Sequence, residues 1–290
     1  MVLRLPKELF YMNIKTKKTL LKIYLFLAVL ASVLLTVWRT VLLKEHCNPY
    51  DMSFQDGSLS ALQAFEYSLL AISALLATSA LFVRKVSFGL FGARASTTSV
   101  AVCALCGFML GAVGILTLFY HSSEIFSFSA EDSSMFRIFR IATIALMFVS
   151  ALYFLSRAST AMKNSPSVAT LSLALPCFCI AYILASYLNS DTPLLDFNRI
   201  TSELAFISAL MFMLSEARLA TYQNGYAFRF ASSLVCIVCT CSHIVPLLLL
   251  SAFWEMSITL SILTDISLIA IRLYAVFAAF NAIRTLKETE

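Results

Sequence analysis

Residues 203–218 read Glu-Leu-Ala-Phe-Ile-Ser-Ala-Leu-Met-Phe-Met-Leu-Ser-Glu-Ala-Arg, an apolar run with charged residues at both ends. This is most of a membrane-spanning helix, which needs about 20 mainly apolar residues. A charged side chain at bilayer depth costs about 2.5 kcal/mol or more, so Glu203, Glu216 and Arg218 need compensating partners. The run therefore predicts a bundle of spanning helices whose other members supply those partners.

The composition of the whole chain also indicates a membrane protein. Of its 290 residues, 60% are hydrophobic and 13% are charged. Soluble domains have roughly 45–50% apolar and about 25% charged residues. The net charge of +5 does not indicate nucleic-acid binding, because the basic residues flank apolar runs. Every cysteine except Cys47 lies inside an apolar run, where a thiol packs as a small hydrophobe.

Apolar runs of spanning length recur along the chain and predict an all-α, polytopic transmembrane helical bundle of about eight spans. A basic segment, residues 1–19, precedes a single transmembrane domain, residues 20–283, and residues 284–290 form a tail. The first run exceeds the signal-peptide core of about 7–15 residues, so we expect an uncleaved helix. The spans are predicted near residues 20–43, 59–83, 98–120, 136–156, 167–188, 200–219, 230–252 and 256–282.

Basic and acidic loops alternate between these spans, which predicts the orientation of the bundle. Lysine and arginine concentrate in cytoplasmic loops of membrane proteins. The N-terminal segment and the loops with Arg84 and Arg157 are basic, whereas those with Asp51 and Asp191 are acidic. We therefore expect both termini in the cytoplasm (N-in/C-in) and a location in the plasma (cytoplasmic) membrane.

Ionisable residues inside the spans are the candidate site. At about 1.5 Å per residue, Asp265 falls near the middle of its span, where a side chain is least able to reach the interface. We expect Asp265 to have a proton- or cation-linked role. Glu216 and Arg272 fall at similar depth near the inner end, so we expect them to pair. The predicted path residues are Glu66, Glu203 and Asp265, with Arg39, Arg140, Arg272 and Glu216 as counter-ions.

Two interpretations of these charges remain open. Ionisable groups inside a membrane are candidates for function, which favours a polar path between spans two, four, six and eight. The same groups also pair between helices and fix their register, as Ser and Thr do elsewhere in a bundle.

Pro176 and Pro246 lie within the fifth and seventh spans. A proline removes one helical hydrogen bond, so each span is predicted to kink, either as a fixed bend or as a hinge. The freed carbonyls belong to Ser172 and Ser242, four residues earlier, and local readjustment is expected there.

Two further motifs favour packing over chemistry. Gly107 and Gly111 have the spacing that lets two helices approach closely, within the chain or between two copies. A group of thiols and one imidazole follows on the seventh span: Cys236, Cys239, Cys241 and His243. Metal ligands of this kind usually lie on turns, so we expect no metal and no cofactor.

Catalytic motifs are absent from the sequence. It has no phosphate-binding Gly-rich loop with lysine, no zinc-protease signature and no nucleophile elbow. None of His46, His121 and His243 has a carboxylate at catalytic spacing. Ser215-Glu216-Ala217-Arg218 resembles a pattern in uncharacterised multi-pass membrane proteins of bacteria, and this resemblance implies no activity.

The leading hypothesis is a permease-like or transport-associated membrane protein with a small-molecule substrate that the sequence does not define. Its partners would be the lipid bilayer and a membrane or ATPase subunit, with no nucleic acid. The first alternative is a structural or regulatory subunit, or a sensor, without transport. The second is an intramembrane enzyme acting on lipid, for which no motif is present.

Overall fold

The computed structural model describes residues 14–47, 59–83, 87–88, 97–126, 134–159, 166–188, 197–222, 226–253 and 260–287. Within these ranges the chain is helical apart from a single bridge residue, short breaks and two strands of two residues. Eight of its helical segments are long and apolar enough to cross a membrane. The predicted all-α bundle of about eight spans is therefore confirmed.

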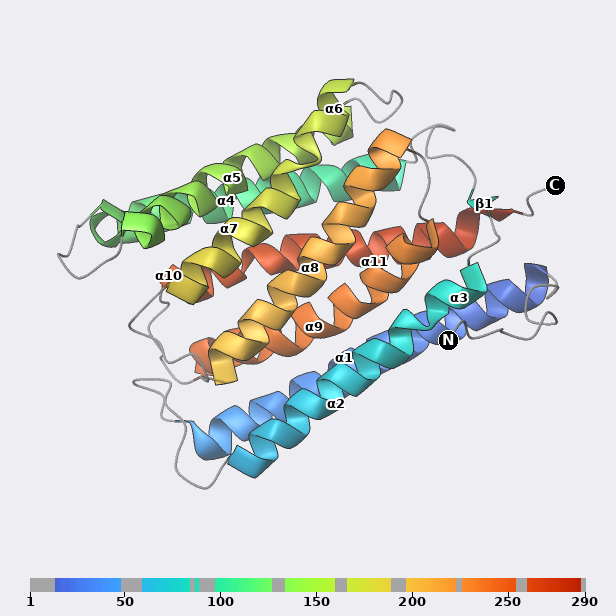
Figure 1. Ribbon diagram of the computed structural model, residues 1–290, viewed down its shortest axis with the longest axis horizontal. Coiled ribbons are helices and arrows are strands. Elements are labelled where there is room, and N and C mark those ends of the chain that lie inside the picture. Colours follow the sequence, from blue (N-terminus) through green and yellow to red (C-terminus); the bar gives the residue numbers. More distant parts are fainter. Residues whose placement is uncertain are drawn as a thin grey trace.

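The spans run up and down through the bundle in chain order (Figure 1). Three of them are interrupted, between α2 and α3, between α6 and α7, and between α10 and α11. The elements are α1 Ile14–His46, α2 Leu59–Ala77, α3 Ser79–Val83, β1 Ser87–Phe88, α4 Thr97–Phe126, α5 Ser134–Ser159, α6 Pro166–Leu171, α7 Ala174–Leu188, α8 Phe197–Tyr222, α9 Tyr226–Phe253, α10 Leu260–Asp265, α11 Ser267–Thr285 and β2 Leu286–Lys287.

We name the two ends of the bundle by which helices begin and finish there. At the end that we call the terminal end, α1 begins and α11 finishes (Figure 1). There β1 pairs with β2 in antiparallel register, Ser87 opposite Lys287, and links the connection after α3 to the last helix. At the opposite end, which we call the distal end, α1 finishes and α8 begins.

The helix boundaries differ from the predicted spans at both ends of the chain. Helix α1 begins at Ile14, so it includes part of the basic N-terminal segment predicted to precede the first span. The last span begins at Leu260 in the structure, and the predicted residues 256–259 lie outside the described residues. The fifth span, predicted to kink at Pro176, is divided into α6 and α7 around Ser172 and Leu173.

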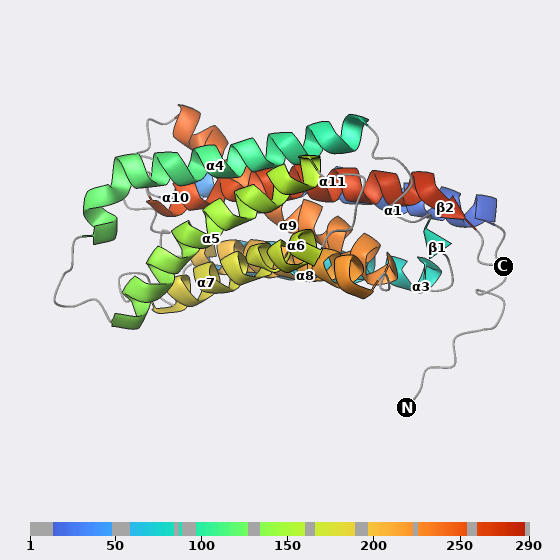
Figure 2. The same cartoon turned by 90° about the horizontal axis from the view of Figure 1, so that it is seen from above.

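Helix α9 lies at the centre of the bundle. It packs against α1, α2, α3, α8 and α11, and Figure 2 shows it between α11 on one side and α8 on the other. Most of its residues are buried, including polar residues such as Ser233 and Thr240. Their hydroxyls donate to carbonyls of their own helix, at 2.6 Å each. A helix surrounded by protein can therefore hold small polar side chains without leaving them unsatisfied.

The face of α4 that carries Gly107 and Gly111 packs against α5 of the same chain. A Cβ atom added at Gly107 would lie 2.8 Å from Leu155 Cγ of α5, whereas one at Gly111 would lie 3.9 Å from Ala151 Cβ. The close approach of α4 and α5 thus depends on Gly107, which packs within the chain, whereas Gly111 has ordinary contact distance there.

Candidate functional site

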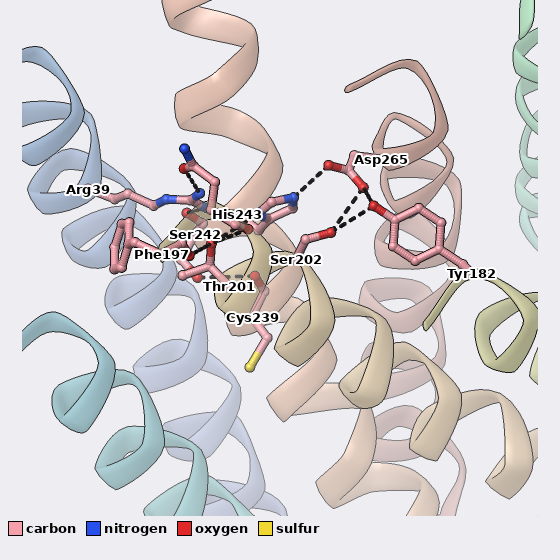
Figure 3. A network of polar contacts seen from close by, with 10 residues as sticks. Arg39, Tyr182, Phe197, Thr201, Ser202, Cys239, Ser242, His243 and Asp265 are labelled. Carbon is pink, nitrogen blue, oxygen red and sulfur yellow. Dashed lines mark hydrogen bonds and ion pairs between the residues drawn. The ribbon is translucent and has the colours of Figure 1, made fainter. Parts of the chain in front are cut away.

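A buried carboxylate, Asp265, is the centre of a polar cluster at the junction of α10 and α11 (Figure 3). Its side chain is fully enclosed, with 2% of the residue exposed. Oxygen Oδ1 accepts hydrogen bonds from the Tyr182 hydroxyl of α7 at 2.8 Å and from the Ser202 hydroxyl of α8 at 3.2 Å. Oxygen Oδ2 lies 2.8 Å from Nε2 of His243 on α9. Both oxygens of Asp265 are therefore in direct hydrogen-bond contact with other helices.

The cluster continues through His243 to Arg39 of α1. Arg39 has no exposed surface, although it lies on the first span of the chain. Its Nη1 atom is 2.8 Å from His243 Nδ1 and donates to the Ser242 carbonyl at 3.1 Å. Its Nη2 atom donates to Asn198 Oδ1 at 3.1 Å, and the guanidinium lies over the Phe197 ring. An imidazole thus bridges a buried cation and a buried anion.

The hydrogen-bond roles determine the tautomer of His243. A guanidinium only donates hydrogen bonds, so Nδ1 of His243 must accept from Arg39. The proton of the neutral ring therefore lies on Nε2, which donates to Asp265. In this state Arg39 is charged, His243 is neutral and Asp265 is ionised, and the three groups carry no net charge.

The local sequence explains how two of these groups reach the cluster. Proline lacks an N–H group, so Pro246 leaves the Ser242 carbonyl without its helical donor, and Arg39 supplies one. Asp265 is the last residue of α10, where the span is interrupted before Ser267. The Ile269 N–H donates to the Ile266 carbonyl at 3.0 Å, so α11 begins with a tighter turn. Interrupted helices in membrane proteins occur where the backbone is enclosed by protein, and they often carry binding sites.

Polar residues line the contact between α8 and α9 at intervals of seven. On α8 they are Thr201, Ser208 and Ser215, and on α9 they are Arg229, Cys236 and His243. The Thr201 hydroxyl lies 3.4 Å from His243 Nδ1, the Ser208 hydroxyl interacts with the Cys236 thiol, and the Ser215 hydroxyl lies 3.3 Å from that of Ser232. This repeat, which we call the α8–α9 seam, connects the Asp265 cluster with a second group of charges.

The second group lies near the terminal end and is centred on Glu216 of α8. Glu216 forms an ion pair with Arg229 of α9, and both side chains are buried. The Tyr274 hydroxyl of α11 donates to the other carboxylate oxygen at 3.1 Å. Arg157 of α5 interacts electrostatically with Glu216 and donates to the Tyr153 hydroxyl at 3.4 Å. Helices α5, α8, α9 and α11 are thus joined at this end.

The remaining predicted site residues lie apart from Asp265. Glu203 pairs with Arg199 of its own helix at 3.0 Å and accepts from Ser186 of α7 at 3.3 Å. Glu66 of α2 and Arg272 of α11 are half-buried. Arg140 is half-buried on α5, with its guanidinium 5.8 Å from the Phe136 ring centroid. Among the predicted path residues and counter-ions, the structure links the path residue Asp265 to the counter-ion Arg39, through His243.

Three sequence-based expectations require correction. Glu216 pairs with Arg229 instead of Arg272, because α9 begins at Tyr226 and carries Arg229 inside the bundle. His243 does have a carboxylate partner, which a different helix supplies. Asp265 lies near the distal end of its span, six residues into α10, and not in the middle.

Several residues of the cluster were not predicted from the sequence: Tyr182, Asn198, Ser202 and His243. One signal was available, because the seven-residue spacing of Arg229, Cys236 and His243 matches that of Thr201, Ser208 and Ser215. Matched polar positions on consecutive helices indicate a shared interface.

Comparison with known proteins identifies no relative of this chain. No protein-family model matches the chain, and no curated protein or solved structure is similar to it. Within the part of the chain that the structure describes, no three His, Cys, Asp or Glu side chains form a group that could hold a metal ion. The fold and the buried charges define an integral membrane protein with multiple spanning helices.

Proposed function

We propose that this membrane protein is a permease-like or transport-associated protein in which Asp265 and His243 bind and release a proton. The observation that carries the proposal is the chain of contacts from Asp265 through His243 to Arg39, buried between α10, α9 and α1. Ionisable groups enclosed between membrane-spanning helices mark ion pathways, proton relays or counter-ions in membrane proteins.

A proton is the ligand that suits this geometry best. Both carboxylate oxygens of Asp265 are in contact with donors at 2.8–3.2 Å, so a larger cation would have to displace those donors. A proton needs no such space. The cluster is also neutral without an added cation, because Arg39 compensates Asp265 through His243.

Protonation would change the contacts of the first helix. An imidazolium donates from both nitrogens, so a proton added to His243 would place a donor, and a like charge, against Arg39 Nη1. Arg39 would then leave His243, and α1 would shift relative to α9. This gives a physical connection between proton binding and helix movement, which is what a proton-coupled carrier requires.

The orientation and the membrane are part of the same proposal. Of the exposed lysines and arginines in the described chain, Lys15, Lys22, Arg218 and Arg284 lie at the terminal end, whereas Lys44 lies at the distal end. The positive-inside tendency supports placing that end, with both termini, in the cytoplasm, and the plasma membrane is the proposed location.

Proton uptake into reconstituted vesicles tests the proposal. The vesicles contain a pH-sensitive dye, and a potassium diffusion potential draws protons inward. A mixture of small polar solutes is added outside, because a coupled carrier moves protons only with its substrate. We expect uptake by the natural protein, loss of uptake in Asp265→Asn and unchanged uptake in Glu45→Gln, whose side chain is exposed.

Equal signals from the natural protein and a folded Asp265→Asn variant would contradict the proposal. That result would favour the alternative in which the cluster fixes helix register in a structural or regulatory subunit, since every helix of the cluster is joined to another by it.

A further inference from the structure

We infer that α1 binds an anionic phospholipid at the terminal end, with the headgroup on Lys15, Lys18 and Lys22 and an acyl chain along the apolar residues that follow on the same face. This inference does not depend on the proposed proton chemistry. It rests on the length of α1, on the positions of its lysines and on the apolar residues that continue their row along the exposed outer side of the helix.

The length of α1 places these lysines at headgroup level. Its 33 residues form a helix about 50 Å long at about 1.5 Å per residue, longer than the roughly 30 Å of bilayer hydrocarbon. Lys22 and Lys44 are separated by about 33 Å along the axis, which matches the hydrocarbon thickness. Lys22 therefore marks one hydrocarbon boundary, and Lys15 and Lys18 lie beyond it.

Helix geometry gathers the three ammonium groups. Residues at i, i+3 and i+7 share a face, which places Lys15, Lys18 and Lys22 in one row. Side chains of a helix point toward its N-terminus, so the Lys22 side chain extends back toward Lys18 and away from the hydrocarbon. Lys15 and Lys22 are exposed, and Lys18 is half-buried. Lys17 lies on a different side of the helix.

The same row continues as an exposed apolar stripe. Phe26, Val29 and Val33 follow Lys22 at helical spacing and are exposed by 66%, 45% and 53%. The opposite side of α1, with Leu21, Ala28 and Arg39, is buried against the bundle, mainly on α9. Lysines above an apolar stripe match the two parts of an anionic lipid, a negative headgroup and a hydrocarbon chain.

An anionic lipid is the partner that complements the positive charge of these lysines. Juxtamembrane lysines are attracted to anionic headgroups, and this attraction decreases within a Debye length of the surface. A bound lipid would hold α1 by its outer face, while the inner face keeps Arg39 in contact with His243. We therefore expect anionic lipid to stabilise the docking of α1 on α9.

The test uses the full chain in nanodiscs made of phosphatidylcholine alone or with added phosphatidylglycerol. Thermal unfolding reports stability, and native mass spectrometry after transfer to detergent counts retained phosphatidylglycerol. Two variants with the same loss of charge at the terminal end are compared, Lys15→Gln/Lys22→Gln on the stripe and Lys17→Gln/Arg284→Gln away from it.

We expect phosphatidylglycerol to raise the unfolding temperature of the natural protein and of Lys17→Gln/Arg284→Gln. In Lys15→Gln/Lys22→Gln at least half of that shift and most of the retained lipid should be lost. Equal behaviour of the two variants, or no shift in the natural protein, would overturn the inference. Equal stabilisation by soluble glycerol phosphate would also overturn it, because the apolar stripe would then play no part. If the chain forms dimers and retains no lipid, a second copy covers the stripe, and the inference is also overturned.

Discussion

The guanidinium of Arg39 donates a hydrogen bond to the carbonyl oxygen of Ser242 at 3.1 Å, and this carbonyl is the one that Pro246 leaves without a helical donor. A proline in the seventh span thereby creates an acceptor for a cation on the first span. The same guanidinium contacts His243, the residue next to Ser242, so a single helix defect positions both the carbonyl and the imidazole for Arg39.

Replacement of Arg39 tests whether it compensates Asp265. Arg39→Met leaves a buried carboxylate without its counter-charge, which should lower the free energy of unfolding by about 3–5 kcal/mol. Asp265→Asn in the same chain should recover part of this loss, with a coupling energy of about 0.5–3 kcal/mol. Denaturant unfolding in mixed micelles measures both values. Arg140→Met and Asp265→Asn are the control pair and should be additive within about 0.5 kcal/mol.

The tautomer of His243 can be observed directly. The sequence has only three histidines, so His46→Gln/His121→Gln leaves His243 as the single labelled imidazole in a nitrogen NMR spectrum. We expect a neutral ring at neutral pH, with the proton on Nε2, because Nδ1 accepts from Arg39. A spectrum with the proton on Nδ1, or on both nitrogens, would disprove the arrangement. In the Arg39→Met variant, Nδ1 of His243 should lose the hydrogen bond from Arg39, and the Nδ1 resonance should shift.

The partner of Glu216 can be tested by comparing two arginines. Arg229→Gln removes the ion pair and leaves Glu216 buried, so the free energy of unfolding should fall by about 3 kcal/mol or more. Arg272→Gln, on the half-buried face of α11, should lower it by less than about 1 kcal/mol. The reverse order of the two effects would show that Glu216 pairs with Arg272, the partner expected from the sequence.

Two glycines of α4 provide a matched test of helix packing. Gly107→Ala would place a methyl group 2.8 Å from Leu155 Cγ, so it should destabilise the protein by about 1–3 kcal/mol. In Gly111→Ala the added methyl group would lie at ordinary contact distance, 3.9 Å from Ala151 Cβ. Because alanine has the better helix propensity, this substitution should be neutral or stabilising by about 0.5–1 kcal/mol. Equal losses of unfolding free energy in the two variants would contradict this account of the α4–α5 contact.

The architecture could be predicted from the sequence because it depends on local composition. Apolar runs of spanning length identify the helices, because this effect acts within one helix. Of the two predicted proline sites, Pro176 lies beside the interruption between α6 and α7, whereas α9 continues through Pro246. Asp265 stands out in the sequence because it is expected near the middle of its span; that depth is wrong, and the structure instead encloses Asp265 near the distal end.

The partners of the charges could not be predicted, because they depend on which helices are neighbours. His243 and Asp265 are on different helices and meet across the distal end of the bundle. The Glu216 pair was missed for another reason: the predicted seventh span began at residue 230, which left Arg229 in a loop. Helix α9 in fact begins at Tyr226, so Arg229 enters the bundle at the level of Glu216.

The contacts of Arg39 also bear on how the chain is inserted during synthesis. Its described partners Asn198, Ser242 and His243 follow it by 159 to 204 residues. At about 5–20 residues per second the ribosome needs on the order of 10 to 40 s to produce them. Throughout that interval the first helix carries a guanidinium whose final partners do not yet exist. We therefore expect α1 to reach its final position in the bundle only after α8 and α9 have emerged.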